Sequence, residues 1–249
     1  MQTPNYARLA ELYQQCEFKR WVNEVQSAEK INIVRTKEQP ELSIAPESQA
    51  AKHAAVAPTV DTSAETAQIS IDRSGYQTVL TAAQFDALLT LLQQTELVAL
   101  DTETTSLDYM QAQLVGISVA TAPGTAWYIP VGHDYLGAPP QLERDWVLSQ
   151  LKPWLEDDSK AKVGQNLKYD MSVLARYDIS LRGVRFDTML ESYVLNSVGS
   201  RHDMDSLALK YLGHTTISFE DIAGKGAKQL TFNQIELEKA AEYAAEDAD

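Results

Sequence analysis

Cysteine and histidine are scarce in this sequence. The 249 residues include one cysteine, Cys16, and four histidines, His53, His133, His202 and His214. One cysteine cannot form an internal disulfide, so we expect a reducing compartment and predict a cytoplasmic location. The scattered histidines and the lone cysteine provide no ligand pair of the kind that zinc sites use.

Long apolar runs and an excess of basic charge are also lacking. No run of about 18 apolar residues indicates a membrane span, and the opening MQTPNYARLAELY lacks the basic and apolar blocks of a secretory signal. Asp and Glu number 35 against 21 Lys and Arg, a formal net charge of -14. This acidity counts against a protein that coats nucleic acid, but an enzyme that holds a few nucleotides through metal ions is compatible with it.

Composition divides the chain into three parts. Residues 1–29 contain apolar side chains at helical spacing, which predicts a helix over 4–29. Residues 30–75 are rich in Ala, Pro and Glu without a sustained apolar period, which predicts a disordered linker. Residues 76–249 have the apolar patterns of one compact domain.

The compact part mixes strands and helices. A helix should begin with Thr81 as N-cap and Gln84 as its capping-box partner, and the last helix should run from about Asn233, with Thr231 or Asn233 as cap. A further helix is expected over 144–156, and strands over 76–80, 97–102, 113–120, 125–131 and 162–163. The three consecutive strands over 97–102, 113–120 and 125–131 have short connections and should form an antiparallel meander. The pattern predicts an α/β fold, a mixed sheet flanked by helices with functional groups at strand ends.

The strand over 97–102 leads into two acids, Asp101 and Glu103. Strand side chains alternate between faces, so both acids project from the same face. Carboxylates so close together repel and resist ionisation unless a cation offsets their charge, and oxygen ligands suit Mg²⁺ or Mn²⁺. The alternative is a strand end whose acids are solvated.

Two further pairs of polar residues lie four positions apart on predicted helices. Asn166 and Asp170 share one face of a helix that Asn166 is placed to cap, and Tyr243 and Asp247 share one face of the last helix. For either pair alone, an acid on a solvated helix face also explains the spacing.

Together, these motifs resemble a known family. Asp-x-Glu on a strand, Asn-x-x-x-Asp on a central helix and Tyr-x-x-x-Asp on the last helix resemble the 3'-5' exonucleases of the DEDD class that carry a tyrosine. The resemblance is to the proofreading domain of bacterial (family A) DNA polymerase I, part of its Klenow fragment. It extends over 76–249 through LVALDTETTSLD, AWYIPVGHDYL, VGQNLKYD, FDTMLESYVLNS, RHDMDSLA, FEDIAGKG and YAAEDAD. LAELYQQCEFKRW, within residues 1–29, resembles the end of the 5'-nuclease region. The resemblance implies a ribonuclease H-like fold in a fragment that lacks the polymerase domain.

The resemblance also implies a site for two metal ions, Mg²⁺ or Mn²⁺. Asp101 is expected to bridge both ions, and Glu103 and Asp247 to complete the tighter site. Asp170 is expected to hold the second ion, largely through water. Tyr243 is expected to orient the attacking water, because a phenol with a pKa of about 10 is a poor general base at neutral pH.

Five residues are implied as substrate contacts. Leu107 and Phe219 should wedge and stack against the last bases, a contact that tolerates any sequence. Gln165, Asn166 and Arg201 should meet sugar, phosphate or terminal groups. Without the resemblance, ordinary packing would explain Leu107 and Phe219 as well, and Arg201 would be a surface charge.

Four other acids, Asp187, Glu191, Asp203 and Asp205, are assigned no metal. Their spacing fits helix starts and solvated faces.

The predicted activity is hydrolysis of the terminal phosphodiester of single-stranded or frayed DNA 3' ends, which releases nucleoside monophosphates and serves proofreading in replication and repair. The expected partners are the DNA end and, in the intact protein, a covalently linked polymerase domain. We expect a monomer with no membrane association. A non-catalytic scaffold and an RNA-trimming exonuclease of the same superfamily are the alternatives. The four carboxylates with Tyr243 argue against the first, and the polymerase-like segments argue against the second.

Overall fold

In the computed structural model, residues 72–198 and 201–249 are described. The helix predicted over 4–29 and the linker as far as residue 71 lie outside the described residues. At the end of the predicted linker, Arg73–Gly75 form a short 3-10 turn, η1, capped by the side chain of Asp72. The described domain therefore begins slightly before residue 76.

A six-stranded mixed sheet forms the centre of the domain, in the order β1-β4-β3-β2-β5-β6. β2 pairs antiparallel with β3, and β3 with β4, whereas β1 and β4, β2 and β5, and β5 and β6 pair parallel. The predicted antiparallel meander is therefore confirmed, and β2 lies in the interior of the sheet. The strands are β1 (Gln77–Thr78), β2 (Leu97–Thr104), β3 (Leu114–Ala122), β4 (Thr125–Pro130), β5 (Ala161–Gly164) and β6 (Val184–Asp187).

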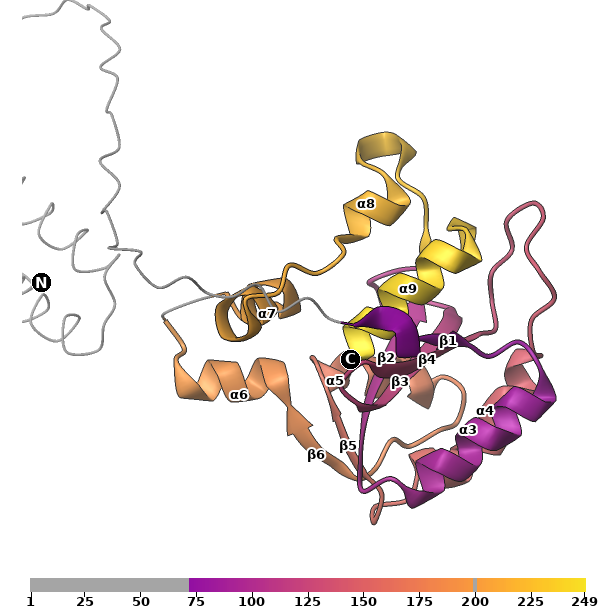
Figure 1. The fold of residues 1–249 in the computed structure, drawn as a ribbon, viewed down its shortest axis with the longest axis horizontal. Helices are drawn as coiled ribbons and strands as arrows, with labels where there is room; N and C mark the ends of the chain where they lie inside the picture. Colours follow the sequence, from indigo (N-terminus) through magenta and orange to yellow (C-terminus); the bar gives the residue numbers. More distant parts are fainter. Residues whose placement is uncertain (1–71, 199–200) are drawn as a thin grey trace, which may run out of the picture. The chain divides into compact units, whose positions relative to one another are not determined.

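Helices cover both faces of this sheet (Figure 1). One face carries α3 (Ala82–Gln94), α4 (Arg144–Leu155) and α5 (Leu167–Ala175), and the other is crossed by α9 (Leu237–Ala248). The segment between β6 and α9 contains α6 (Thr188–Leu195), α7 (Met204–Leu212), α8 (Phe219–Ala223) and the 3-10 turns η2 (Gly226–Lys228) and η3 (Phe232–Gln234). None of the helices in residues 72–198 and 201–249 has the length and apolar character needed to cross a membrane.

Alternation along β2 assigns its side chains to the two faces. Val98 and Leu100 are buried in the larger core on the α3–α4 side. Ala99 packs on the α9 side, which is therefore also the side of Asp101 and Glu103. Burial of apolar surface, at about 25 cal/mol per Å², fixes the register of β2, because a slip of one residue would exchange its two faces.

The helix α9 lies close to the sheet because its inner face consists of alanines. Ala240, Ala244, Ala245 and Ala248 are all buried. Small side chains allow a helix backbone to approach its neighbour, and α9 contacts β2, β3 and β4. This close approach brings the last turn of α9 to the acids of β2.

Some boundaries differ from the sequence predictions. The capping box of Thr81 and Gln84 at the start of α3 is confirmed. The last helix begins at Leu237 rather than near Asn233, because Thr231 caps the separate turn η3 and the chain is extended at Ile235. β6 was not predicted, because Val184–Asp187 is short and mostly polar or exposed.

Gly116 on β3 makes room for the buried side chain of Tyr128 on β4. A Cβ added at Gly116 would lie 2.2 Å from the Tyr128 hydroxyl oxygen and 2.3 Å from its Cζ. Gly116 also pairs with Glu103 in the β2–β3 ladder, so the Tyr128 ring lies beside the strand position of this acid.

We expect Gly116→Ala to lower the free energy of unfolding by about 1–3 kcal/mol, because the tyrosine ring would have to shift within a packed core. Urea denaturation followed by circular dichroism measures this loss. Ser118→Ala is the control: the Ser118 side chain lies on the same strand, is fully buried and has no hydrogen-bond partner. Equal stability of Gly116→Ala and wild type would contradict this packing.

Candidate active site

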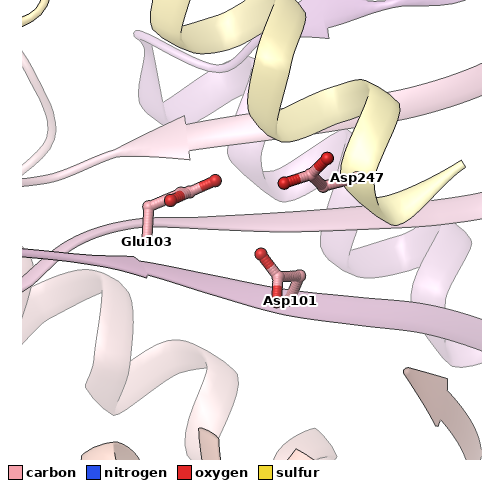
Figure 2. Close-up of side chains that lie close together, drawn as sticks. All are labelled: Asp101, Glu103 and Asp247. Atoms are coloured by element: carbon pink, nitrogen blue, oxygen red, sulfur yellow. The ribbon is translucent and has the colours of Figure 1, made fainter. Parts of the chain in front are cut away.

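Three carboxyl groups meet between β2 and the last turn of α9. Asp101 and Glu103 point from β2 toward α9, and Asp247 points from α9 toward the strand (Figure 2). One oxygen from each of the three lies within 4.8 Å of the others. The structure thus brings Asp247 to the two strand acids, from which it is distant in sequence.

Asp170 reaches the site from the other side of the sheet. It is buried on α5, and its Oδ1 accepts a hydrogen bond of 2.5 Å from the Thr102 hydroxyl. Thr102 lies between the two acids of β2, so its side chain faces the opposite way. Asp170 is outside the three-carboxyl cluster, but it is near enough for its charge to raise the pKa of Glu103.

Burial raises the pKa of each of these four carboxyl groups. It raises the pKa of Asp101 from 3.8 to about 6. The pKa of Glu103 lies well above its usual range, first through burial and then through the charges of Asp101, Asp247 and Asp170. Burial followed by the charge of Asp101 also raises the pKa of Asp170 and that of Asp247. In the described part of the chain, no lysine or arginine forms an ion pair with any of the four.

The donor set fits a hard divalent cation. The cluster offers only carboxylate oxygens, and Glu103 Oε1 is buried without a hydrogen-bond partner. A buried acceptor without a partner is costly, and a bound cation would satisfy it and offset the repulsion. Asp101, Glu103 and Asp247 are the residues that could hold such an ion, and Asp170 is a further acid whose charge acts on Glu103.

Tyr243 lies one helical turn before Asp247. Its pKa is raised by burial first, then by the negative charges of Asp247 and Glu103 and by a hydrogen bond to Asp247. The hydroxyl therefore keeps its proton at neutral pH and can donate it in a hydrogen bond. The rings of Phe219 and Phe232 lie at centroid distances of 6.3 and 6.0 Å from the Tyr243 ring.

The predicted stacking residues differ in their surroundings. Leu107, in the loop after β2, is 93% exposed, so core packing does not explain it. Phe219 is half-buried at the start of α8, edge-on to Tyr243 and stacked on Phe232. The structure therefore places Phe219, but not Leu107, in contact with a residue of the candidate site.

Gln165 and Arg201 already have partners. The Gln165 amide donates to the His202 carbonyl at 2.7 Å and accepts from the Thr188 hydroxyl. Arg201 is exposed and pairs with Asp203 at 3.0 Å, as expected for a surface charge.

Asn166 does not cap α5 as predicted. It is exposed, has the left-handed backbone conformation with φ 59, and makes no side-chain capping bond. Asp187 caps instead: its carboxylate accepts from the backbone N–H groups of Asn166 and Leu167 at 3.2 and 2.9 Å. Asp187 also caps α6. The helix-start role expected for Asp187 is therefore confirmed, and the residue serves two helices.

Two residues beside the acids were not predicted, Thr102 and Tyr128. Tyr128 is fully buried, its hydroxyl pairs with His133 Nε2 at 2.8 Å, and burial followed by the charge of Glu103 raises its pKa. The alternation of side chains along β2 could have indicated Thr102, because a residue between Asp101 and Glu103 must face the opposite side of the sheet, where α5 lies. Nothing in the sequence indicates the position of Tyr128.

Most of the chain is similar to known proteins. A family model described as 3'-5' exonuclease matches residues 76–249. The chain is 64% identical over 176 residues to DNA polymerase I of Pseudomonas aeruginosa, covering 70% of this chain and 19% of that protein. It is 44% identical over 200 residues to DNA polymerase I of Rhizobium leguminosarum, covering 74% of this chain and 20% of that protein. It thus spans about a fifth of the length of these relatives.

A solved structure shares the fold. RNase D of Escherichia coli, described as an exoribonuclease involved in structured RNA processing, matches with a TM-score of 0.50 and 24% identity, over 70% of this chain and 41% of that one. The mixed sheet flanked by helices is the ribonuclease H-like fold that the family resemblance implied.

Replacing the double cap should destabilise the domain. We expect Asp187→Ala to lower the free energy of unfolding by about 2 kcal/mol, because the starts of two helices lose their acceptor. Asp203→Ala, which removes the cap of α7 alone, should cost about half as much. Thermal and urea unfolding compare the two variants, and an equal loss in both would contradict the double role.

The raised pKa values predict that stability falls with pH when no metal is present. The folded protein holds protons on these acids that the unfolded chain releases above pH 3.8, the ordinary value for aspartate. The contribution of these acids to stability is therefore greatest below this pH, and the part that Asp101 contributes is lost as the pH rises through about 6.

Asp101→Asn should consequently stabilise the domain in EDTA at pH 8 by more than about 1 kcal/mol, since one pKa unit corresponds to about 1.4 kcal/mol. The gain should vanish below pH 4. Asp86→Asn on the exposed side of α3 is the control. Thermal unfolding across this pH range measures both variants against wild type, and a stability difference between Asp101→Asn and wild type that does not grow from pH 4 to 8 would disprove the assignment.

Proposed function

The chain belongs to the 3'-5' exonuclease family found in DNA polymerase I, and we propose that it hydrolyses the terminal phosphodiester of a DNA 3' end with the help of two divalent metal ions. The products are nucleoside monophosphates, and the substrate is a single-stranded or frayed end. The proposal rests on one observation: three carboxyl groups converge within 4.8 Å, and one of their oxygens is buried without a partner.

Each carboxylate has a separate task in this proposal. Asp101 would contribute to holding both ions, Glu103 and Asp247 would complete the tighter site, and Asp170 would help to hold the second ion. Mg²⁺ or Mn²⁺ suits the all-oxygen ligands. When bound, two such ions supply the positive charge that activates water and stabilises the leaving oxygen and the crowded phosphate.

Tyr243 orients the attacking water in this proposal. Its raised pKa keeps the phenol protonated, so it positions the water as a hydrogen-bond donor and does not remove its proton. Its place between Asp247 and the Phe219 ring supports this role.

The remaining groups bind the DNA end. Phe219 stacks on a terminal base and Leu107, exposed on its loop, wedges between bases. Gln165, Asn166 and Arg201 contact sugar, phosphate or the terminal hydroxyl. Arg201 must exchange Asp203 for the substrate, because the two form an ion pair in the free protein.

In the intact protein we propose that this domain edits the product of a covalently linked polymerase domain. The relatives are DNA polymerases about five times as long as the match, which supports this context.

Replacing Asp101 should abolish hydrolysis. We expect Asp101→Ala to slow the shortening of a 5'-labelled single strand by at least about 100-fold in Mg²⁺ or Mn²⁺. The reason is that stabilisation of the negative charge on the reacting phosphate is lost. Glu96→Ala is the control, because Glu96 is an exposed acid that directly precedes β2. Equal activity of Asp101→Ala and wild type would refute the catalytic assignment. A matched RNA strand tests the substrate class, and faster cleavage of RNA than DNA would favour an RNA-trimming enzyme.

Replacing Tyr243 should have a smaller effect than replacing any of the four carboxylates. We expect Tyr243→Phe to reduce the rate of hydrolysis by about 10-fold, because the four carboxylates remain. This loss is smaller than the loss of about 100-fold or more that follows removal of a general acid or base. Titration calorimetry should give unchanged Mn²⁺ affinity. A Tyr243→Phe variant that no longer binds Mn²⁺ would show that the hydroxyl holds the site together instead.

A further inference from the structure

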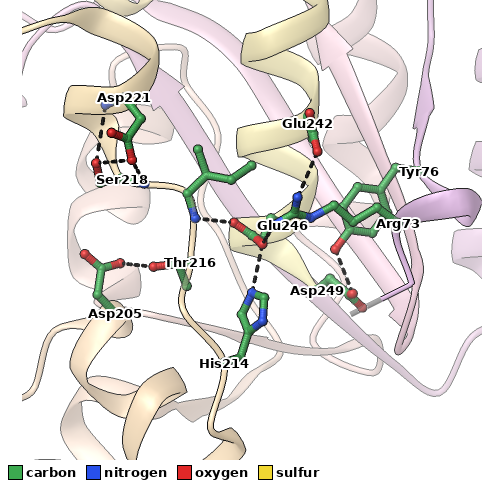
Figure 3. A network of polar contacts seen from close by, with 11 residues as sticks. Arg73, Tyr76, Asp205, His214, Thr216, Ser218, Asp221, Glu242, Glu246 and Asp249 are labelled. Carbon is green, nitrogen blue, oxygen red and sulfur yellow. Dashed lines mark hydrogen bonds and ion pairs between the residues drawn. The ribbon is translucent and has the colours of Figure 1, made fainter. Parts of the chain in front are cut away.

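Glu246, next to Asp247 on α9, is a buried acid outside the carboxyl cluster. Its side chain is only 1% exposed. Its Oε1 accepts from His214 Nε2 at 2.9 Å and from the guanidinium of Arg73, and its Oε2 accepts from the backbone N–H of Ile217 at 2.6 Å (Figure 3). A buried carboxylate that accepts from Arg73 and from two donors of the segment 214–218 is a fixed junction rather than a solvated helix face.

Further polar contacts hold the same end of α9. Asp249 accepts from the Tyr76 hydroxyl at 2.8 Å and from the backbone N–H of Gly124 at 2.7 Å. Arg73 also reaches the exposed Glu242 at 2.9 Å, one turn before Glu246 (Figure 3). Asp247 therefore lies on a turn that is held from both sides.

The segment 214–218 connects this junction to the predicted stacking residue. His214 and Ile217 bind Glu246, and the Thr216 hydroxyl donates to Asp205 at 2.7 Å. The next residue after the segment is Phe219, the first residue of α8. Because Ile217 is two residues before Phe219, the Glu246 carboxylate helps to set where this ring lies.

The junction also borders the space beside the acids. A cavity of about 500 Å³ is lined by Asp101 and Asp247 together with His214, Thr216 and Glu246. Movement of the segment 214–218 would therefore change the surroundings of the acids as well as the position of Phe219.

We propose that Glu246 is a positioning residue that holds Asp247 and Phe219 in one arrangement, so that metal binding and stacking of the DNA 3' end depend on the same carboxylate. This inference rests on the proposed function. Glu246 touches neither metal nor DNA and acts only through its neighbours on the helix and on the segment 214–218.

The test compares Glu246→Gln with wild type in two separate binding measurements. Glutamine keeps the shape of the side chain but has one acceptor oxygen for three donors. We expect Mn²⁺ affinity, measured by calorimetry without DNA, to fall about 10-fold, as for the loss of a group that supports a metal ligand. Binding of an oligonucleotide with 2-aminopurine at its 3' end, measured by fluorescence in EDTA, should fall about 3-fold.

Glu242→Gln is the matched control, because Glu242 lies on the same helix and binds the same arginine, and among the described residues it forms no hydrogen bond or ion pair with 214–218. It should leave both affinities unchanged. Circular dichroism establishes that each variant is folded. A folded Glu246→Gln variant with both affinities unchanged, or with only one of them changed, would overturn the proposal.

If Glu246→Gln does not fold, a second pair of variants tests the same proposal. His214→Ala removes one donor from the junction, and His214→Gln restores a donor amide. We expect both affinities to fall in the first and to recover in part in the second, whereas no change in His214→Ala would overturn the proposal. A wild-type protein that does not bind Mn²⁺ would instead refute the proposed function, and this inference with it.

Discussion

The gathering of four carboxyl groups at one place, two of them buried and two partly buried, governs the architecture around them. Asp101, Glu103, Asp170 and Asp247 each have a raised pKa because burial disfavours their charged forms. Such a group of acids is costly to fold without a cation, so the scaffold around it has to be rigid. An interior strand, two packed helices and a series of buried contacts provide that rigidity.

The two faces of the sheet contribute different parts of the site. β2 presents Asp101 and Glu103 toward α9 and Thr102 toward α5, where its hydroxyl holds Asp170. The alternation of one strand thus gathers acids from helices on opposite faces. The alanine face of α9 completes the arrangement, because larger side chains would keep Asp247 away from the strand.

Polar contacts around the site are as specific as the apolar packing. Asp187 caps two helices, and Glu246 joins α9 to η1 and to the segment before α8. Asp187 was expected on a helix start or a solvated face, and no role was predicted for Glu246. In the structure they connect segments that are distant in sequence, and such connections fix the positions of neighbouring functional groups more tightly than apolar contacts, which are non-directional.

Local patterns in the sequence were sufficient to predict most of the secondary-structure elements and to identify the acids of the site. Periodicity predicted the meander and α3, and the spacing of Asp101, Glu103, Tyr243 and Asp247 predicted which of their side chains share a face. The tertiary structure alone decided that Asp187 and not Asn166 caps α5, that the last helix begins at Leu237, and that Glu246 is buried. Helical and strand periods are properties of neighbouring residues, so sequence reveals them. Hydrogen bonds between distant segments depend on how the whole chain packs, and no local pattern encodes them.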